Sequence, residues 1–252
     1  MIYVCIATHN DARTIGVLLW KLRKVFAEFP REYHILVADD GSTDGTGDTL
    51  EMYQQALPMT LLQSPTPRGR AACLESLFRD ALDRSDRPRR DGVATLPADF
   101  SYSPVVVLDL IKRFESGADV VIGESDLAGE SLGMRLVHRW APRLLRPGIQ
   151  LPGLRDPLSG VALIRLVTLK NVLADRHGGL LETDGVSTHA ELVARAATQA
   201  RQIAAVPVGR HVNGLRSRST DAPLGTALAL FRAGRRLEIP APSVPIQRPG
   251  SP

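Results

Sequence analysis

Short apolar runs alternate with longer segments in which apolar residues recur at helical spacing through the first half of the chain. The short runs predict strands at 2–7, 33–38, 59–63, 93–96 and 118–123. The longer segments predict helices at 12–29, 44–56, 71–82 and 103–115. This alternation, with short connections, is typical of an α/β fold whose mostly parallel sheet carries helices on both faces.

The second half has a less regular rhythm. Its apolar pattern predicts a helix at 132–146, a strand at 161–165, a helix at 188–197 and a strand at 203–207. We expect all these elements to form a single domain over residues 1–220. Residues 221–237 predict a C-terminal amphipathic helix, and the Pro-rich stretch 238–252 predicts a disordered tail.

Polar clusters follow three of the predicted strands. They lie at residues 8–11, 39–42 and 97–103. In open α/β sheets, ligands bind beyond the carboxyl ends of the strands. We therefore expect the three clusters to meet at one edge of the sheet and to form the site.

Composition narrows the range of partners. The 252 residues suit one domain, and the formal net charge of +4 comes from an excess of arginine. That charge permits anionic partners, but the few aromatic residues are not interleaved with the arginines, so we expect no nucleic-acid partner. Cys5 and Cys73 show neither a metal spacing nor a disulfide framework. Because the chain also lacks a signal-peptide pattern and an apolar run of about 18 residues, we expect a cytoplasmic protein without a spanning helix.

The segment Asp39-Asp40-Gly41-Ser42-Thr43-Asp44-Gly45-Thr46 directly follows a predicted strand. Carboxylates at a strand end can accept hydrogen bonds from ribose hydroxyls or base N–H groups, and glycine permits a tight turn. Ser42 or Thr43 can cap the helix that follows. Spacing alone leaves a second interpretation open, in which the segment is an Asp/Gly-rich surface turn.

This segment resembles the hallmark motif of the family 2 glycosyltransferases. Further segments resemble other motifs of that family, in the same order along the chain. They are Ala7-Thr8-His9-Asn10-Asp11, Pro67-Arg68-Gly69-Arg70-Ala71-Ala72, Asp156-Pro157-Leu158-Ser159-Gly160, and the predicted helix and strand within 188–208. The layout is most similar to that of dolichyl- and polyprenyl-phosphate sugar synthases.

The resemblance implies a GT-A-like, Rossmann-like fold and a pocket for a nucleotide sugar. The residues it places in this donor pocket are Ala7, Thr8, His9, Asp11, Asp39, Asp40 and Gly69. The alternative for His9 is an ordinary half-exposed loop residue.

The metal-binding motif departs from the family pattern. Related enzymes carry Asp-Ala-Asp after the fourth strand, where two carboxylates hold Mg²⁺ or Mn²⁺ against the donor diphosphate. Here the segment reads Pro97-Ala98-Asp99, and proline has no side-chain ligand. We expect Asp99 and Ser101 to be the metal ligands and the ion to be weakly held.

A basic helix is predicted at 132–146. Arg135, Arg139, Arg143 and Arg146 share one face of it, beside apolar residues, so it can lie on an anionic membrane. We expect Arg135 and Arg139 to bind an acceptor phosphate. The alternative is a solvated face on a packing helix.

A phosphate-binding arginine of the family is also missing, because the segment after the fifth strand reads Gly123-Glu124-Ser125. The late family motif Arg-x-x-Gly-x-Ser also departs, because it reads His211-Val212-Asn213-Gly214-Leu215-Arg216 here, and Arg210 or Arg216 can substitute by position. Glu191 lies on the predicted helix 188–197, where the resemblance implies a base toward sugar acceptors. The alternative is a surface glutamate, and a phosphate acceptor needs no strong base because it is already a nucleophile near neutral pH.

The resemblance implies transfer of a hexose from a GDP- or UDP-sugar to an acceptor such as polyprenyl phosphate, with inversion by direct displacement. Asp99 and Glu191 are the expected catalytic residues. An inactive or weakly active relative that binds nucleotide sugars is the first alternative, and Pro97 favours it. A nucleotidyltransferase is the second, but it would need a Gly-rich, basic loop that residues 8–13 do not provide. The membrane association would be peripheral, on the inner face.

Overall fold

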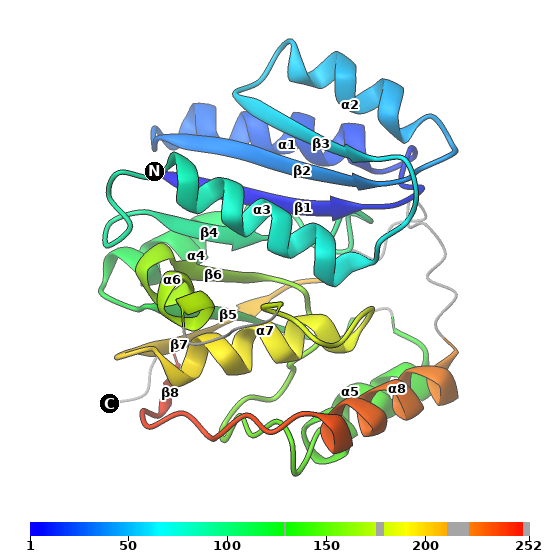
Figure 1. The fold of residues 1–252 in the computed structure, drawn as a ribbon, viewed down its shortest axis with the longest axis vertical. Coiled ribbons are helices and arrows are strands. Elements are labelled where there is room, and N and C mark those ends of the chain that lie inside the picture. The colour runs from blue at the N-terminus through cyan, green and yellow to red at the C-terminus, as the bar shows by residue number, and fades with distance from the viewer. Residues whose placement is uncertain (129, 175–178, 211–221, 249–252) are drawn as a thin grey trace.

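The computed structural model describes residues 1–128, 130–174, 179–210 and 222–248 (Figure 1). Its strands are β1 Ile2–Thr8, β2 Tyr33–Asp40, β3 Met59–Ser64, β4 Gly92–Thr95, β5 Val120–Ser125, β6 Ala162–Arg165, β7 Ile203–Val208 and β8 Ile246–Gln247. Its helices are α1 Ile15–Glu28, α2 Thr46–Gln54, α3 Arg70–Arg84, α4 Val106–Glu115, α5 Leu132–Leu144, α6 Leu166–Ala174, α7 Ser187–Thr198 and α8 Pro223–Arg236. The apolar pattern predicts each of these elements except α6 and β8.

The strands form one 8-stranded sheet in the order β3-β2-β1-β4-β6-β5-β7-β8 (Figure 1). β6 runs antiparallel to β4 and β5, whereas the other strand pairs in the described ranges are parallel. The predicted α/β fold with a mostly parallel sheet is therefore confirmed. Because β6 is reversed, its starting end lies at the same edge as the carboxyl ends of β1, β2 and β4.

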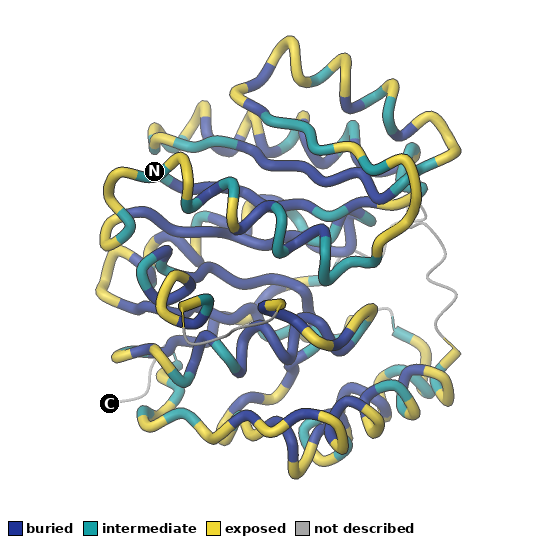
Figure 2. The backbone as a smooth tube through the Cα atoms, in the orientation of Figure 1, coloured by how far each residue is buried: buried dark blue, intermediate teal, exposed yellow. Residues whose placement is uncertain are grey.

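Alternate side chains of the inner strands pack on opposite faces of the sheet, as the two-residue period of a strand requires. In β1, Ile2, Val4 and Ile6 join a buried cluster with α1 and α4. Tyr3 and Cys5 join a second cluster with α3, α6 and α7. Figure 2 shows the resulting buried centre of the sheet. Helices on both faces thus fix the strand ends from which the site loops start.

α5 and α8 lie side by side and run in the same direction (Figure 1). A Cβ on Gly133 would lie 2.9 Å from Pro223 Cγ, and a Cβ on Gly234 would lie 2.5 Å from the carbonyl oxygen of Leu145. The two helix starts therefore lie together, as do the two helix ends, and glycine permits the close approach. Both helices share an apolar cluster with α7. Its buried members include Val137, Ala141, Ala190, Ala194, Leu230 and Ala233.

The segment after α8 lies along the body of the protein and does not form the disordered tail expected at 238–252. β8 pairs in parallel with β7, and Arg248 Nη2 donates to Glu124 Oε1 at 2.9 Å. The physical reason is that Ile239 and Ile246 contact two of the apolar clusters. Residues 249–252 lie outside the described part of the chain.

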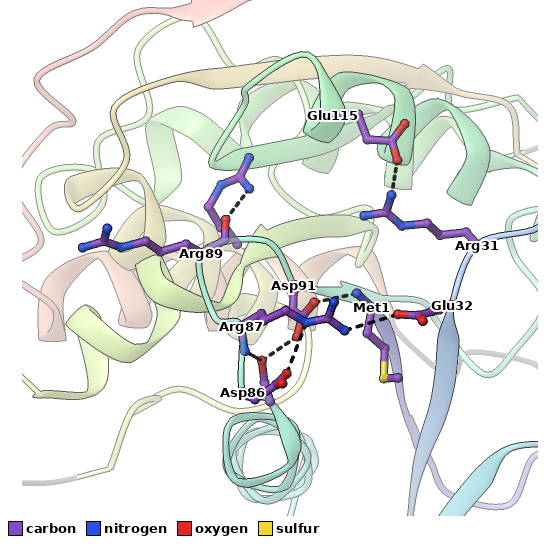
Figure 3. Close-up of polar contacts among 10 residues, drawn as sticks. Met1, Arg31, Glu32, Asp86, Arg87, Arg89, Asp91 and Glu115 are labelled. Carbon is purple, nitrogen blue, oxygen red and sulfur yellow. Dashed lines mark hydrogen bonds and ion pairs between the residues drawn. The ribbon is translucent and has the colours of Figure 1, made fainter.

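Ion pairs gather at the edge of the sheet opposite the strand ends that carry the polar clusters (Figure 3). The Met1 amino group lies 2.5 Å from Asp91 Oδ1, and Arg31 Nη1 lies 2.6 Å from Glu115 Oε1. These contacts tie β1 and β2 to the loop before β4 and to the end of α4. The predicted site residues lie away from this edge.

Candidate functional site

The loops after β1 and β2 are bound to each other by their own polar atoms. His9 Nδ1 lies 2.7 Å from the carbonyl oxygen of Asp40, and the Asn10 N–H donates to Ser42 Oγ at 2.9 Å. In return, the Thr43 N–H donates to Asn10 Oδ1 at 2.8 Å. Asn10 has a φ of 57°, a left-handed conformation that asparagine adopts more readily than most residues. The two motifs therefore form one continuous surface.

Asp39 and Asp40 are neighbours with different roles. Asp40 accepts the N–H of Arg68 at 2.6 Å on one oxygen and the N–H of Gly69 at 2.9 Å on the other. Burial opposes ionisation, but these donors outweigh it and lower the pKa of Asp40. Asp39 accepts the Ser42 hydroxyl at 2.5 Å through Oδ1. Asp40 thus positions the loop before α3, while Asp39, which is also buried, holds Ser42 in the loop after β2.

Gly69 lets the start of α3 approach an acidic side chain closely. Its φ is 93°, and a Cβ there would lie 2.9 Å from Asp184 Cγ. Asp184 Oδ1 also accepts the Ala71 N–H at 3.2 Å. The loop before α3 is therefore held from two sides, by Asp40 and by Asp184. Sequence reasoning missed Asp184, which lies in a loop without any motif.

Asp11 connects the loop after β1 with the start of α2. Thr8 Oγ1 donates to Asp11 Oδ2 at 2.9 Å, and the Asp11 N–H donates to Thr46 Oγ1 at 3.0 Å. Burial raises the pKa of Asp11, and the negative charge of Asp99 adds to that rise. The parallel register of β1 with β2 and with β4 brings the three polar clusters to one edge of the sheet, as expected.

Asp99 and Ser101 fit a divalent cation poorly. The Ser101 N–H donates to Asp99 Oδ1 at 2.9 Å, and the Ser101 hydroxyl bonds to Oδ2. Mg²⁺ and Mn²⁺ need several oxygen ligands, and the side chain of Pro97 supplies none. Within the described ranges, no group of three or more His, Cys, Asp or Glu residues could hold a metal. One carboxylate that is already hydrogen bonded through both oxygens is a weak donor set.

Asp156, in the loop before β6, is a buried acceptor of three hydrogen bonds. His138 Nδ1 lies 2.9 Å from Asp156 Oδ1, which also accepts the Leu158 N–H at 3.0 Å. The Ser125 N–H donates to Oδ2 at 3.2 Å. The loop is thereby tied to the end of β5 and to α5. Sequence reasoning missed His138, whose only signal was its place on the apolar side of a predicted amphipathic helix.

Glu191 is fully buried, at 0% exposure, and its carboxylate is saturated with donors. It accepts the Glu182 N–H at 3.0 Å and the Thr183 N–H at 2.8 Å. It also accepts the Thr183 hydroxyl at 2.7 Å and Arg195 Nε at 2.8 Å. These bonds make Glu191 the anchor of the loop before α7. The exposed glutamate considered as the alternative is excluded, and the geometry does not favour a free base either.

The four arginines expected to bind phosphate lie in different surroundings. Arg135 and Arg139 are exposed on α5. Arg210 forms an ion pair with Glu130, and its guanidinium lies 5.7 Å from the centre of the Tyr102 ring. Arg216 lies outside the described residues. Arg135 and Arg139 therefore face solvent, and Arg210 is held beside the loop after β4.

Solved glycosyltransferases share this fold. Glucosyl-3-phosphoglycerate synthase from Mycobacterium tuberculosis, in complex with Mn²⁺, UDP and glucosyl-3-phosphoglycerate, aligns with a TM-score of 0.63 and 20% identity, covering 92% of this chain and 76% of that one. S. aureus TarS 1-349 in complex with UDP-GlcNAc aligns with a TM-score of 0.57 and 18% identity, covering 88% of this chain and 62% of that one. At these identities the likeness shows the fold alone, which is the GT-A fold.

Sequence comparison gives the family. An undecaprenyl-phosphate mannosyltransferase from Micrococcus luteus is 28% identical over 209 residues, covering 81% of this chain and 80% of that protein. A dolichol-phosphate mannosyltransferase from Pyrococcus furiosus is 24% identical over 177 residues, covering 67% of this chain but only 47% of that protein. The model of the family described as "Glycosyl transferase family 2" matches residues 3–165, more than half of the chain. The chain therefore belongs to glycosyl transferase family 2.

Proposed function

We propose that this protein transfers a hexose from a nucleoside diphosphate sugar, a GDP- or UDP-sugar, to polyprenyl phosphate. The observation that carries the proposal is the single surface formed by the loops after β1 and β2, with Asp99 close by. It stands at the edge where α/β sheets bind nucleotides. The Micrococcus luteus mannosyltransferase, which aligns over most of its own length, supports the acceptor class.

The donor lies along the ends of β1 and β2 in this proposal. Asp39 accepts hydrogen bonds from the nucleoside, and Asp40 acts indirectly by holding Gly69 in place. Ala7, Thr8, His9 and Asp11 complete the donor pocket.

The reaction is a direct displacement with inversion. An oxygen of the acceptor phosphate attacks the anomeric carbon, and the bond to the nucleoside diphosphate breaks on the opposite side. Because a phosphate needs no strong base, Glu191 serves as the anchor of the loop before α7. Mg²⁺ or Mn²⁺ would neutralise the leaving diphosphate if Asp99 and Ser101 held it, but no step here depends on the ion.

The acceptor approaches along α5 and α8 in this proposal. Leu132 and Trp140 of α5 are 77% and 51% exposed, and Leu224 of α8 is 86% exposed. Exposed arginines stand beside them, including Arg135 and Arg139. Such a surface binds peripherally to anionic lipid, and we place it on the inner face of the membrane. In the part of the chain that the structure describes, no helix has the length and apolar character to cross a membrane.

One feature favours a second function, that of a relative which binds nucleotide sugars without turning them over. Pro97 replaces a carboxylate that the family uses for metal binding. Binding without transfer, in the presence of polyprenyl phosphate, is the outcome that this second function predicts.

A thermal-shift screen of UDP- and GDP-sugars tests donor binding. At a hundredfold excess over Kd, one ligand should raise the melting temperature by about 5 °C, by mass action on the native state. Asp39→Ala should abolish most of that shift. Asp48→Ala is the matched control, because Asp48 is exposed on α2, two residues after the segment 39–46. An equal shift in Asp39→Ala and wild type would place the nucleoside elsewhere.

A further inference from the structure

Arg70, the first residue of α3, carries its guanidinium to the end of β4. An ideal Cβ on Gly160 would lie 3.0 Å from Arg70 Nη2 and 3.0 Å from Pro97 Cγ. The guanidinium and the proline ring are therefore close neighbours, on the open side of a glycine. Gly160 itself is fixed in place, because its carbonyl oxygen accepts Thr95 Oγ1 at 3.0 Å. A cation thus stands beside the position where related enzymes carry a metal-binding carboxylate.

The charge balance of the site calls for such a cation. Asp11 and Asp99 lie close enough for the charge of Asp99 to contribute to the raised pKa of Asp11. A bound diphosphate would add at least two more negative charges to this edge of the sheet. The weak metal donor set of Asp99 and Ser101 does not supply the balancing charge. A guanidinium can do so, because it stays protonated and binds phosphate oxygens through paired N–H donors.

A buried histidine, His189, lies within electrostatic range of Arg70. His189, on α7, is 3% exposed, and its Nε2 has no hydrogen-bond partner. Burial, and then the positive charge of Arg70, lower the pKa of His189 to about 3. The imidazole is therefore neutral at pH 7. It leaves Arg70 as the cationic member of the pair.

We propose that Arg70 binds the donor diphosphate and takes the role that a divalent cation has in related enzymes, so that nucleotide binding is independent of metal. The inference rests on the proposed use of a nucleoside diphosphate donor. Pro97 removes a metal-binding carboxylate, and the neighbouring Arg70 guanidinium supplies the positive charge that the metal would otherwise bring. In this proposal the Asp99 carboxylate keeps its hydrogen bonds to Ser101 or binds the donor directly, and no metal ion bridges Asp99 and the donor.

The test is a measurement of Kd by isothermal titration calorimetry in EDTA and in Mn²⁺. The probes are UDP, GDP and the uncharged nucleosides uridine and guanosine. Wild type should bind one diphosphate in EDTA, and Mn²⁺ should change its Kd by less than about threefold. Arg70→Gln should weaken diphosphate binding by about tenfold or more and leave nucleoside binding unchanged, because only the phosphate contact is lost. Arg70→Lys should recover part of the affinity.

Arg79→Gln is the matched control, since Arg79 is an exposed arginine on the same helix, paired with Glu75. Binding of wild type that disappears in EDTA and returns with Mn²⁺ would overturn the inference. So would an Arg70→Gln protein that keeps the wild-type preference for diphosphate over nucleoside. A wild type that binds neither probe in either buffer would instead contradict the proposed function itself.

Pro97→Asp provides a second test that leaves Arg70 in place. The new carboxylate would lie beside the guanidinium and pair with it, so diphosphate binding in EDTA should weaken. Mn²⁺ should then restore it, because the second metal-binding carboxylate is present again. A Pro97→Asp protein whose diphosphate Kd in EDTA equals that of wild type would show that Arg70 is not the phosphate-binding cation.

Discussion

His138 Nδ1 lies 2.9 Å from Asp156 Oδ1, and both side chains are buried. This hydrogen bond joins α5, whose outer face carries Arg135 and Arg139, to the loop that leads into β6. The loop in turn reaches the end of β5 through the Ser125 N–H. The helix proposed to meet the lipid is therefore bound directly to the edge of the sheet that holds the site.

Breaking that hydrogen bond should destabilise the protein. His138→Leu leaves a buried acceptor with one partner fewer, so the free energy of unfolding should fall by about 2 kcal/mol. Urea unfolding measures it. His34→Leu is the control, because His34 hydrogen bonds to Thr60 in the half-buried β2–β3 pair and should cost less. Equal stability of His138→Leu and wild type would show that the contact carries little of the link between α5 and the sheet.

Burial of His189 should make the free energy of unfolding depend on pH. Its pKa is lowered from 6.5 to about 3 by burial and by Arg70, so the folded state holds the imidazole neutral. Well above pH 6.5 the His189 imidazole is neutral in both the folded and the unfolded state, so its protonation costs no stability. As the pH falls toward 3, only the unfolded state binds the proton, and stability is lost. His189→Gln should therefore show a shallower fall in unfolding free energy between pH 6.5 and 4. Parallel pH profiles for the two proteins would contradict it.

The variant Glu191→Gln distinguishes a structural role of Glu191 from a role as general base. Loss of the charge weakens the contacts with Thr183 and Arg195, so the melting temperature should fall. Transfer to a phosphate acceptor by the folded variant should stay within about threefold of wild type. Loss of a general base would instead lower kcat by roughly a hundredfold or more. A fall in kcat of that size with unchanged stability would show that Glu191 is a catalytic residue.

The exposed arginines of α5 should contribute to binding of anionic membranes. Replacing Arg135, Arg139 and Arg143 with Gln should reduce binding to anionic vesicles by about a hundredfold at low salt, because each basic residue near such a surface adds attraction. Co-sedimentation measures the bound fraction. Gln at Arg23, Arg79 and Arg90 is the control, with the same net charge change at exposed positions elsewhere. Wild type that ignores anionic vesicles at low salt would make α5 an ordinary packing helix.

The parts of the fold that could be predicted are those with a local signal. β1 and β2 are continuous apolar runs that end at polar motifs, so their type, order and shared edge follow from the chain itself. α6 could not be separated in this way, because it follows β6 directly at Leu166 without a Gly or Pro between them. β8 exists only through pairing with β7, a contact that no local pattern reveals.

In the site, too, only the features with a local sequence signal could be predicted. The motif at 39–46 indicated where a nucleotide would bind, but not that Asp40 would be occupied by two N–H groups. The burial of Glu191 depends on the loop that precedes α7, whose Glu182 and Thr183 fold back onto the carboxylate, and only Arg195, four residues on, gave a local signal. Arg70 lay inside a recognised motif, yet its position beside Pro97 follows from the meeting of α3, β4 and β6.

The most direct test of the central claim is transfer itself. Each labelled UDP- or GDP-sugar is incubated with the protein and anionic vesicles that contain polyprenyl phosphate, and label extracted with the lipid is measured. We predict lipid-linked label from one donor, at a rate that Asp39→Ala reduces at least about a hundredfold and Asp48→Ala does not change. A donor that raises the melting temperature but gives no lipid-linked label, while the protein binds the vesicles, would contradict the proposal and identify a protein that binds nucleotide sugars without transferring them to this acceptor.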